Sequence, residues 1–279
     1  MDRRNFLRTT ATVSAAFALM PAMACSSLER KTGLILYTVR GDMDKDPMGT
    51  LDQIAKLGFN WLEAANYSQG KFYDMKPSVF KKAIEERGMQ LISSHNGLNA
   101  ENVDEVIGAA AEAGLKYLVM PSLPGNWRSS PDAYKEAAQF MNEAGLKCKD
   151  HGMKLGFHNH HTEFIPMDGI IPYDILVKNT EPGLVTFELD LAWITKGEQN
   201  PIDYFKKYPG RFELLHIKDL STELHDATLG EGTIDFAPIF KEVKLAGMKY
   251  FFIEQDSCKT HTPLESIKIS RDYLFSTVF

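Results

Sequence analysis

Residues 152–160 read Gly-Met-Lys-Leu-Gly-Phe-His-Asn-His, and this stretch shows the local pattern that decides the fold. The glycine follows a helix-like run and is placed to end it, because glycine readily adopts the left-handed conformation found after helix C-termini. The apolar residues after it are typical of a short strand buried on both faces, as in a parallel sheet. The polar residues from His158 onward then mark the end of that strand.

The same pattern recurs four more times along the chain. In each case a helix-like run ends at a glycine and a short apolar run follows; these glycines are Gly58, Gly88, Gly114 and Gly247. Three further apolar runs fit strands without a preceding glycine, at residues 34–37, 185–189 and 212–217. The sequence therefore predicts eight strands.

Helix-like runs alternate with these strands, and we expect them near residues 48–57, 77–87, 101–113, 131–151, 171–180, 201–208, 235–246 and 263–276. Eight strand–helix units in a chain of 279 residues predict an α/β fold, the (β/α)₈ TIM barrel, which typically takes about 250 residues. A doubly wound open sheet is the rival fold. It usually carries a glycine-rich turn after its first strand, and residues 37–41, Tyr-Thr-Val-Arg-Gly, are not such a turn.

Composition narrows the class of protein. The chain is 44% hydrophobic and 24% charged, which is typical of a globular domain with a sizeable core. Three cysteines are too few for a disulfide scaffold or a cysteine-rich zinc module. A net charge of -6 disfavours binding to nucleic acid, because that binding relies on a basic surface. We therefore expect no nucleic-acid partner.

The N-terminus has the pattern of an export signal. Arg3 and Arg4 precede Phe6 and Leu7, and an apolar run of small residues follows over 11–24. That run is shorter than the ~20 residues that span a bilayer, and the paired arginines resemble a twin-arginine signal. We expect residues 1–24 to be this signal, residues 25–32 a tether and residues 33–279 the barrel. The protein is then exported to the periplasm.

The end of this signal can be interpreted in two ways. Ala22-Met23-Ala24 before Cys25 is an A-x-A cleavage site, and it also resembles a lipobox whose cysteine becomes lipidated. Ala22 departs from the leucine that a lipobox normally carries. A lipid on Cys25 is the one membrane contact that the sequence predicts, and both alternatives stay open.

Polar residues close most of the predicted strands. In a TIM barrel the active site lies at these carboxyl ends, so the side chains should converge at one mouth of the barrel. Burying an unpaired carboxylate costs several kcal/mol, so such groups must find partners or a cation. The converging set comprises Glu63, His95, His158, Asp190, His216 and Glu254.

Three carboxylates and one imidazole form a candidate metal site, namely Glu163, Asp190, His216 and Glu254. Oxygen-rich ligands with one nitrogen suit a single divalent ion, for which we expect Mn²⁺ first, with Co²⁺, Mg²⁺ or Zn²⁺ as alternatives. Structural roles are the competing interpretation: Glu254 can form a salt bridge with Lys218, and His216 can be an interior histidine with satisfied hydrogen bonds.

Several motifs carry a resemblance to a known family: residues 36–40, 157–160, 163–164, 189–190, 215–219, 230–235 and 253–254. Over residues 33–279 the sequence resembles the sugar phosphate isomerase/epimerase family of xylose isomerase-like TIM barrels. The resemblance implies one divalent metal held by Glu, Asp, His and Glu, which fall by motif on the four residues above. The His-Asn-His-His insertion shifts the spacing before Glu163, so His158 or His160 is the alternative first ligand.

The resemblance also implies catalytic roles. Glu163 and Glu254 are the expected acid/base pair, each doubling as a ligand, and Lys218 would stabilise a developing oxyanion. The expected substrate-binding residues are Tyr37, Glu63, His95, His158, His160 and Trp193.

The expected reaction is isomerisation or epimerisation of a small unphosphorylated carbohydrate through an enediolate. Trp193 stands where the family's 3-epimerases carry a histidine, which disfavours that activity. The alternative is a lyase or dehydratase that acts by β-elimination on keto-sugars or 3-keto-glycosides. A non-catalytic sugar-binding barrel is the third hypothesis.

Overall fold

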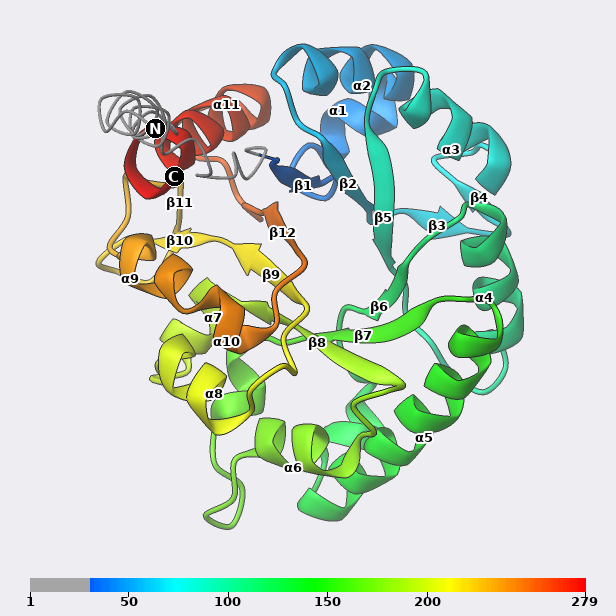
Figure 1. Ribbon diagram of the computed structural model, residues 1–279, viewed down its shortest axis with the longest axis vertical. Coiled ribbons are helices and arrows are strands. Elements are labelled where there is room, and N and C mark those ends of the chain that lie inside the picture. Colours follow the sequence, from blue (N-terminus) through cyan, green and yellow to red (C-terminus); the bar gives the residue numbers. More distant parts are fainter. Residues whose placement is uncertain (1–30) are drawn as a thin grey trace, which may run out of the picture. The chain divides into compact units, whose positions relative to one another are not determined.

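The computed structural model describes residues 31–279, and the predicted export signal and Cys25 lie outside these residues and stay predictions. The described residues confirm the predicted TIM barrel. Eight parallel strands close into one barrel in the order β1-β12-β9-β8-β7-β6-β5-β2 (Figure 1). They are β1 (Gly33–Ile35), β2 (Trp61–Ala64), β5 (Gln90–His95), β6 (Tyr117–Met120), β7 (Lys154–His158), β8 (Val185–Asp190), β9 (Leu214–Ile217) and β12 (Tyr250–Ile253).

Helices surround the barrel on its outside (Figure 1). The predicted runs form α2 (Pro47–Lys56), α3 (Pro77–Glu85), α4 (Val103–Glu112), α5 (Pro131–Asp150), α6 (Pro172–Asn179), α8 (Pro201–Lys207), the pair α9 (Phe236–Lys241) and α10 (Val243–Ala246), and α11 (Pro263–Tyr273). Six of them begin with proline, whose fixed φ suits the first helical turn. None of the helices within residues 31–279 is long and apolar enough to cross a bilayer.

The glycines that ended the predicted helices have the expected backbone conformation. Gly58, Gly88, Gly114, Gly152 and Gly247 all have positive φ, between 70° and 83°. Each lets the chain leave its helix and turn into the next strand, which is why this pattern placed the strands from the sequence.

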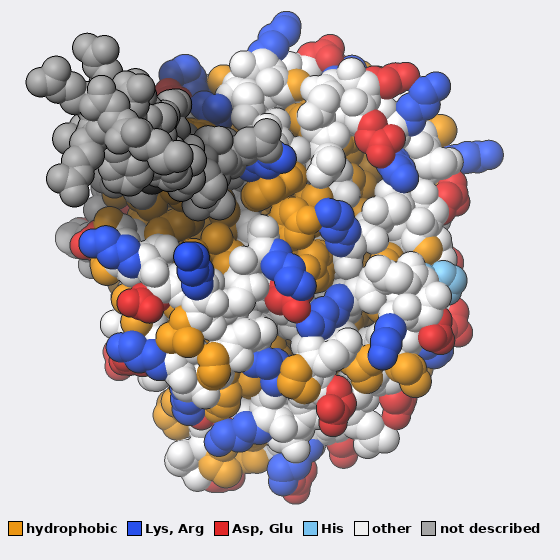
Figure 2. Space-filling view, in the orientation of Figure 1, with side chains coloured by type: hydrophobic (Ala, Val, Ile, Leu, Met, Phe, Trp, Pro, Cys, Tyr) orange, Lys and Arg blue, Asp and Glu red, His pale blue; other side chains and the backbone are white. Residues whose placement is uncertain are grey.

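The strands follow one another clockwise in Figure 1. Because βαβ connections are right-handed, this is the view from the amino ends of the strands. Apolar side chains fill the barrel there, among them Ile35, Tyr117, Leu214 and Phe252. Lys and Arg side chains gather over the middle of this face (Figure 2). The carboxyl ends of the strands open on the opposite face.

Short elements that the sequence pattern did not predict follow the strands. The helices α1 (Arg40–Lys45) and α7 (Leu191–Lys196) come after β1 and β8. Two small hairpins, β3 (Tyr67–Ser68) with β4 (Lys71–Phe72) and β10 (Asp219–Leu220) with β11 (Asp226–Ala227), come after β2 and β9. The remaining elements are the 3₁₀ turns η1 (Gly125–Arg128) and η2 (His161–Phe164) and the C-terminal π-helix η3 (Leu274–Val278).

Candidate active site

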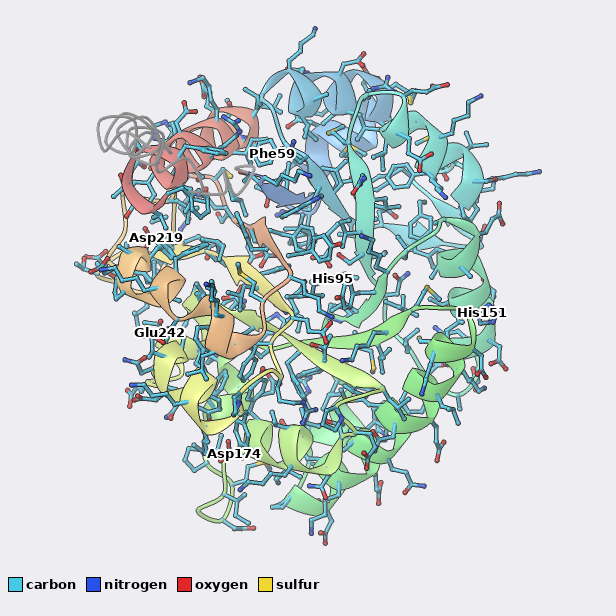
Figure 3. All side chains as sticks on the ribbon, in the orientation of Figure 1. Phe59, His95, His151, Asp174, Asp219 and Glu242 are labelled. Atoms are coloured by element: carbon cyan, nitrogen blue, oxygen red, sulfur yellow. The ribbon has the colours of Figure 1, made fainter. Side chains whose placement is uncertain are left out.

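Buried polar side chains meet inside the barrel near the carboxyl ends of its strands. The structure brings together the six residues that were expected to converge, and adds Glu188. His95 lies near the centre of the ring of strands in Figure 3, whereas His151 and Asp174 lie outside it. These residues form two groups that share His216.

We call the first group the open cluster; it consists of His158, Asp190, His216 and Glu254. One ligand atom from each residue lies within 4.8 Å of the others. His158 Nε2 is 3.5 Å from Asp190 Oδ2, and His216 Nδ1 is 3.0 Å from Glu254 Oε2. Neither His158 Nε2 nor Asp190 Oδ2 has a hydrogen-bond partner although both are buried. Unpartnered nitrogen and oxygen atoms that converge in this way fit a divalent cation.

The two oxygens of Asp190 have different tasks. Oδ1 accepts a hydrogen bond of 2.7 Å from the backbone N–H of Trp193 and so caps the N-terminus of α7. Asn159 in turn accepts a bond from the Asp190 N–H. The carboxylate is thereby fixed with Oδ2 left for an ion.

We call the second group the bonded cluster; it consists of Glu63, His95, Glu188 and His216. One nitrogen of each of its rings is paired with a carboxylate of this cluster, since His216 Nε2 lies 2.7 Å from Glu63 Oε2 and His95 Nε2 lies 2.7 Å from Glu188 Oε2, while the other oxygen of each carboxylate is buried without a partner. A carboxylate that accepts the N–H of a ligand histidine fixes its ring and tautomer. The bonded cluster therefore turns Nδ1 of His216 toward the open cluster.

The two histidines of the open cluster differ in charge. Burial disfavours the charged form of His216, but Glu188 and Glu254 outweigh it and hold the His216 pKa well above its usual range, so this ring must release a proton before it can bind an ion. Burial and the neighbouring histidines hold the pKa of His158 well below its usual range, so its ring is neutral and can offer a lone pair. Burial raises the pKa of Asp190 to about 7, against the opposing effect of Lys218. Burial also favours the neutral form of Glu254, but Lys218 and His216 outweigh it and hold the Glu254 pKa well below its usual range.

Glu163 does not join either cluster. Its Oε2 accepts a bond of 2.7 Å from the His160 N–H, and its Oε1 accepts one of 3.0 Å from the Thr162 hydroxyl. The carboxylate is buried in η2, where it holds the loop after β7. His158, the last residue of β7 and one of the two alternative first ligands, instead lies beside Asp190 in the open cluster.

Lys218 lies beside the open cluster. It is fully buried, its Nζ is hydrogen-bonded to Asp256 Oδ2 and lies 3.5 Å from Glu254 Oε2, and it sits 4.6 Å from the centre of the Trp193 ring. Burial lowers the Lys218 pKa, but the surrounding carboxylates outweigh this and raise it above its usual range. The side chain is therefore a fixed positive charge next to Glu254.

The candidate set from the sequence omitted two residues of this site, Glu188 and Asp256. Each lies two positions from a residue that was included, Asp190 and Glu254 respectively. Residues i and i+2 of a strand point to the same face, and this alternation is the signal that could have found Glu188.

Comparison with known proteins places the chain in a family. The family model described as "Xylose isomerase-like TIM barrel" matches residues 51–276. The chain belongs to this family.

Its relatives include curated enzymes and solved structures. An inosose dehydratase from Clostridium botulinum (strain Alaska E43 / Type E3) is 24% identical over 80% of this chain and 87% of its own length. One from Clostridium perfringens (strain ATCC 13124) is 25% identical over the same shares. A sugar phosphate isomerase/epimerase from Parabacteroides distasonis ATCC 8503, known from a crystal structure, has 30% sequence identity to this chain. The two structures match with a TM-score of 0.78 over 88% of this chain and 94% of that chain. The relatives of this chain therefore include proteins named as dehydratases and a protein named as an isomerase/epimerase.

In this xylose isomerase-like barrel a cavity of about 810 Å³ opens onto the open cluster. Five of the expected substrate-binding residues line it: Tyr37, His95, His158, His160 and Trp193. The sixth, Glu63, is fully buried in the bonded cluster and is not part of the lining. Among the described residues that line the cavity none is Lys or Arg, while Glu105, Glu254 and Asp256 are acidic.

One motif of the resemblance has a structural task. Asp219, which Figure 3 labels away from the barrel centre, accepts bonds from the backbone N–H groups of Gly230, Gly232 and Ile234 at 3.0–3.2 Å. A Cβ at Gly232 would lie 2.3 Å from Asp219 Oδ1, so only glycine fits there. Residues 230–235 thus fold around Asp219 and shape the loop after β9.

Proposed function

We propose that this xylose isomerase-like barrel is a metal-dependent lyase that removes water or an alcohol by β-elimination from a keto-sugar or keto-glycoside. The observation that carries the proposal is the position of Glu163. Epimerisation needs an acid/base group on each face of the reacting carbon, and Glu163 was the expected second group. Both of its oxygens are bonded within η2. Elimination needs only one base and a leaving group.

The curated relatives support the same choice. The inosose dehydratases match this chain over 87% of their own length, and a dehydratase removes water from its substrate. These similarities favour the lyase hypothesis over the isomerase hypothesis that the sequence motifs favoured. The substrate itself is our proposal for this chain.

His158, Asp190, His216 and Glu254 would hold the divalent ion, for which we propose Mn²⁺ first and Co²⁺, Mg²⁺ or Zn²⁺ as alternatives. When bound there, such an ion supplies a Lewis acid that polarises a substrate carbonyl and acidifies the neighbouring C–H. The bonded cluster keeps His216 in the orientation that this requires.

Side chains of this protein then transfer the proton. Glu254, at the cavity wall, takes the proton from the carbon next to the carbonyl, and the fixed charge of Lys218 steadies the negative charge that develops. The C–O bond on the following carbon breaks, a C=C bond forms, and the leaving oxygen receives a proton. Glu254 can return the proton that it took to this oxygen, and His160, whose pKa burial lowers to about 4, is neutral and can hydrogen-bond the leaving oxygen through its N–H.

An isomerase or epimerase is the second candidate, because the relative from Parabacteroides distasonis carries that name. Its reaction starts with the same proton removal and returns the proton to carbon. A phosphorylated substrate is disfavoured for either reaction, because the described lining of the cavity offers no Lys or Arg to a phosphate.

The test is an assay of the Mn²⁺-loaded protein in D₂O with an inosose, free ketoses and 3-keto-glycosides. We expect an unsaturated ketone and release of water or alcohol, detected by mass spectrometry and NMR. Deuterium incorporation into a substrate that keeps its β-oxygen would instead support isomerisation. Absence of both reactions from every substrate would contradict an enzymatic role.

A further inference from the structure

The cavity is larger than one sugar ring needs. A hexose has twelve non-hydrogen atoms, and it fills at most about 360 Å³ even if each atom is given the ~30 Å³ of a liquid water molecule. The cavity of about 810 Å³ is more than twice that size. A single ring at the open cluster therefore leaves the outer part of the cavity to another group.

The β3–β4 hairpin forms one wall of this outer part. Tyr67, Ser68 and Gln69 of the hairpin line the cavity, and Asn102 and Glu105, at the start of α4, line it as well. The Tyr67 hydroxyl donates a bond of 2.9 Å to Glu105 and ties the hairpin to α4. The wall is thus built from two connected elements.

The hairpin is well anchored. Phe72 is 1% exposed, and its ring stacks on Phe80 of α3 at 5.8 Å between ring centres. Its two-residue turn, Gln69 and Gly70, has φ values of 50° and 74°, as a type I′ turn requires. Asn and Gly are the usual residues at such positions, so Gln69 keeps a backbone conformation that its side chain disfavours.

The wall offers polar groups that are free to bind a ligand. The side chains of Ser68 and Gln69 are exposed and make no hydrogen bond to any described residue. Hydroxyl and amide groups of this kind recognise sugar hydroxyls by hydrogen bonds. The acidic Glu105 and the lack of Lys or Arg in the described lining disfavour an anionic group there.

We propose that the outer part of the cavity is a subsite for a second, uncharged, hydroxyl-rich unit, so that the natural substrate has the size of a disaccharide or similar glycoside. The proposal rests on the proposed function in placing the reacting ring at the open cluster. Ser68 and Gln69 bind the outer unit, and Asn102 and Glu105 at the start of α4 complete the same wall.

Binding measurements test the subsite without relying on turnover. Ligand-observed NMR with the Mg²⁺-loaded protein would compare glucose with maltose, cellobiose and trehalose. We expect at least one disaccharide to bind roughly tenfold more tightly than glucose, which corresponds to about 1.4 kcal/mol. We expect glucose 6-phosphate to bind no more tightly than glucose. Equal affinities for glucose and all three disaccharides would overturn the proposal.

The Ser68→Ala/Gln69→Gly variant assigns the effect to the hairpin. Glycine favours the left-handed conformation at position 69, so this change removes the amide while keeping the turn. We expect the preferred disaccharide to lose most of its tenfold advantage while glucose binding is unchanged. Lys71→Ala, on the same hairpin but outside the lining, is the matched control and should keep the advantage. An undiminished advantage in the Ser68/Gln69 variant would contradict the assignment.

These results separate the subsite from the reaction. Tight disaccharide binding without elimination from any keto-sugar would support the subsite and contradict the lyase. Elimination from small ketoses without any preference for disaccharides would support the lyase and overturn the subsite.

Discussion

Buried carboxylates at the two ends of the barrel differ in whether their oxygens have partners. At the amino end, Glu213 accepts bonds from Lys154 and Tyr117 at 2.7 Å and lies 2.9 Å from Lys249. At the carboxyl end, by contrast, three carboxylates each keep a buried oxygen without any partner, namely Glu63, Glu188 and Asp190. The same fold can therefore satisfy a buried carboxylate completely. Of the atoms left without partners at the carboxyl end, Asp190 Oδ2 lies 3.5 Å from His158 Nε2 in the open cluster, and this pair fits a cation.

This difference predicts which end serves stability and which serves activity. A residue that is paired within the chain stabilises the fold, and its loss should lower the free energy of unfolding. A residue held for a ligand destabilises the ligand-free fold, so its loss should cost activity instead. Substitutions at the two ends should therefore have different signatures.

The largest expected effect is at the ligands of the open cluster. Asp190→Asn or His216→Ala should abolish metal binding and lower turnover by about 10³-fold or more, because an interior divalent ion tolerates few missing ligands. The amide oxygen introduced by Asp190→Asn can still cap α7, so the fold should persist. Metal content, steady-state rate and thermal unfolding would be measured together.

Glu163→Gln is the matched control for these ligand substitutions. Its amide oxygen can still accept the His160 N–H, and the side chain lies outside both clusters. We expect the protein to keep its metal. Loss of metal from the Glu163→Gln protein, together with retention in His158→Ala, would return Glu163 to the ligand set.

Glu254→Gln should have the next largest effect. The amide keeps an oxygen toward the ion but cannot take a proton, so turnover should fall by about 10²-fold or more while part of the metal remains bound. Full turnover in this variant, measured at saturating Mn²⁺, would exclude Glu254 as the base.

Lys218→Met removes the fixed positive charge beside Glu254. We expect bound metal to be retained and turnover to fall by about 10²-fold, which corresponds to roughly 3 kcal/mol of lost oxyanion stabilisation. The readout is kcat at constant metal content. A variant that fails to bind metal would show that Lys218 acts on the site's architecture rather than on the reaction.

At the amino end, Glu213→Gln should destabilise the fold by about 1–3 kcal/mol, since Lys154 and Lys249 lose their carboxylate. Chemical denaturation would measure this loss. Metal content and turnover should stay unchanged. A drop in turnover at unchanged metal content would contradict the inference that the amino end serves stability and the carboxyl end serves activity.

The smallest expected effect is a pH dependence at the same place. Burial raises the Glu213 pKa, but the bonds from Lys154, Lys249 and Tyr117 outweigh it and hold the Glu213 pKa below its ordinary value of 4.5. Above pH 4.5 the carboxylate therefore contributes its full stabilisation, and this is lost as pH falls through the lowered folded-state pKa. Urea midpoints from pH 6 to pH 3 should fall more steeply for the native protein than for Glu213→Gln.

The fold could be predicted because its signals are local. Gly58 and Gly152, for example, each end a helix in the left-handed conformation and so fix where the next strand begins. Asp190, His216 and Glu254 could be brought together for a similar reason, since the carboxyl ends of parallel strands meet at one mouth of a barrel.

The remaining details of the site depend on tertiary contacts that the spacing of residues in the sequence does not predict. Glu163 and His158 are five residues apart, and both suit a metal. The sequence does not show that η2 turns the Glu163 carboxylate back onto the His160 N–H. Nor does it show that Glu63 lies under His216 as a hydrogen-bond partner rather than in the cavity wall.

We propose that the open cluster holds the ion and that the bonded cluster orients His216. A crystal structure of the Mn²⁺-loaded protein, with anomalous diffraction at the manganese edge, tests this most directly. We predict one strong peak among His158 Nε2, Asp190 Oδ2, His216 Nδ1 and Glu254 Oε2, with His216 Nε2 still bonded to Glu63. A peak among Glu63, His95 and Glu188, or one that includes Glu163, would contradict the assignment of the ion to the open cluster.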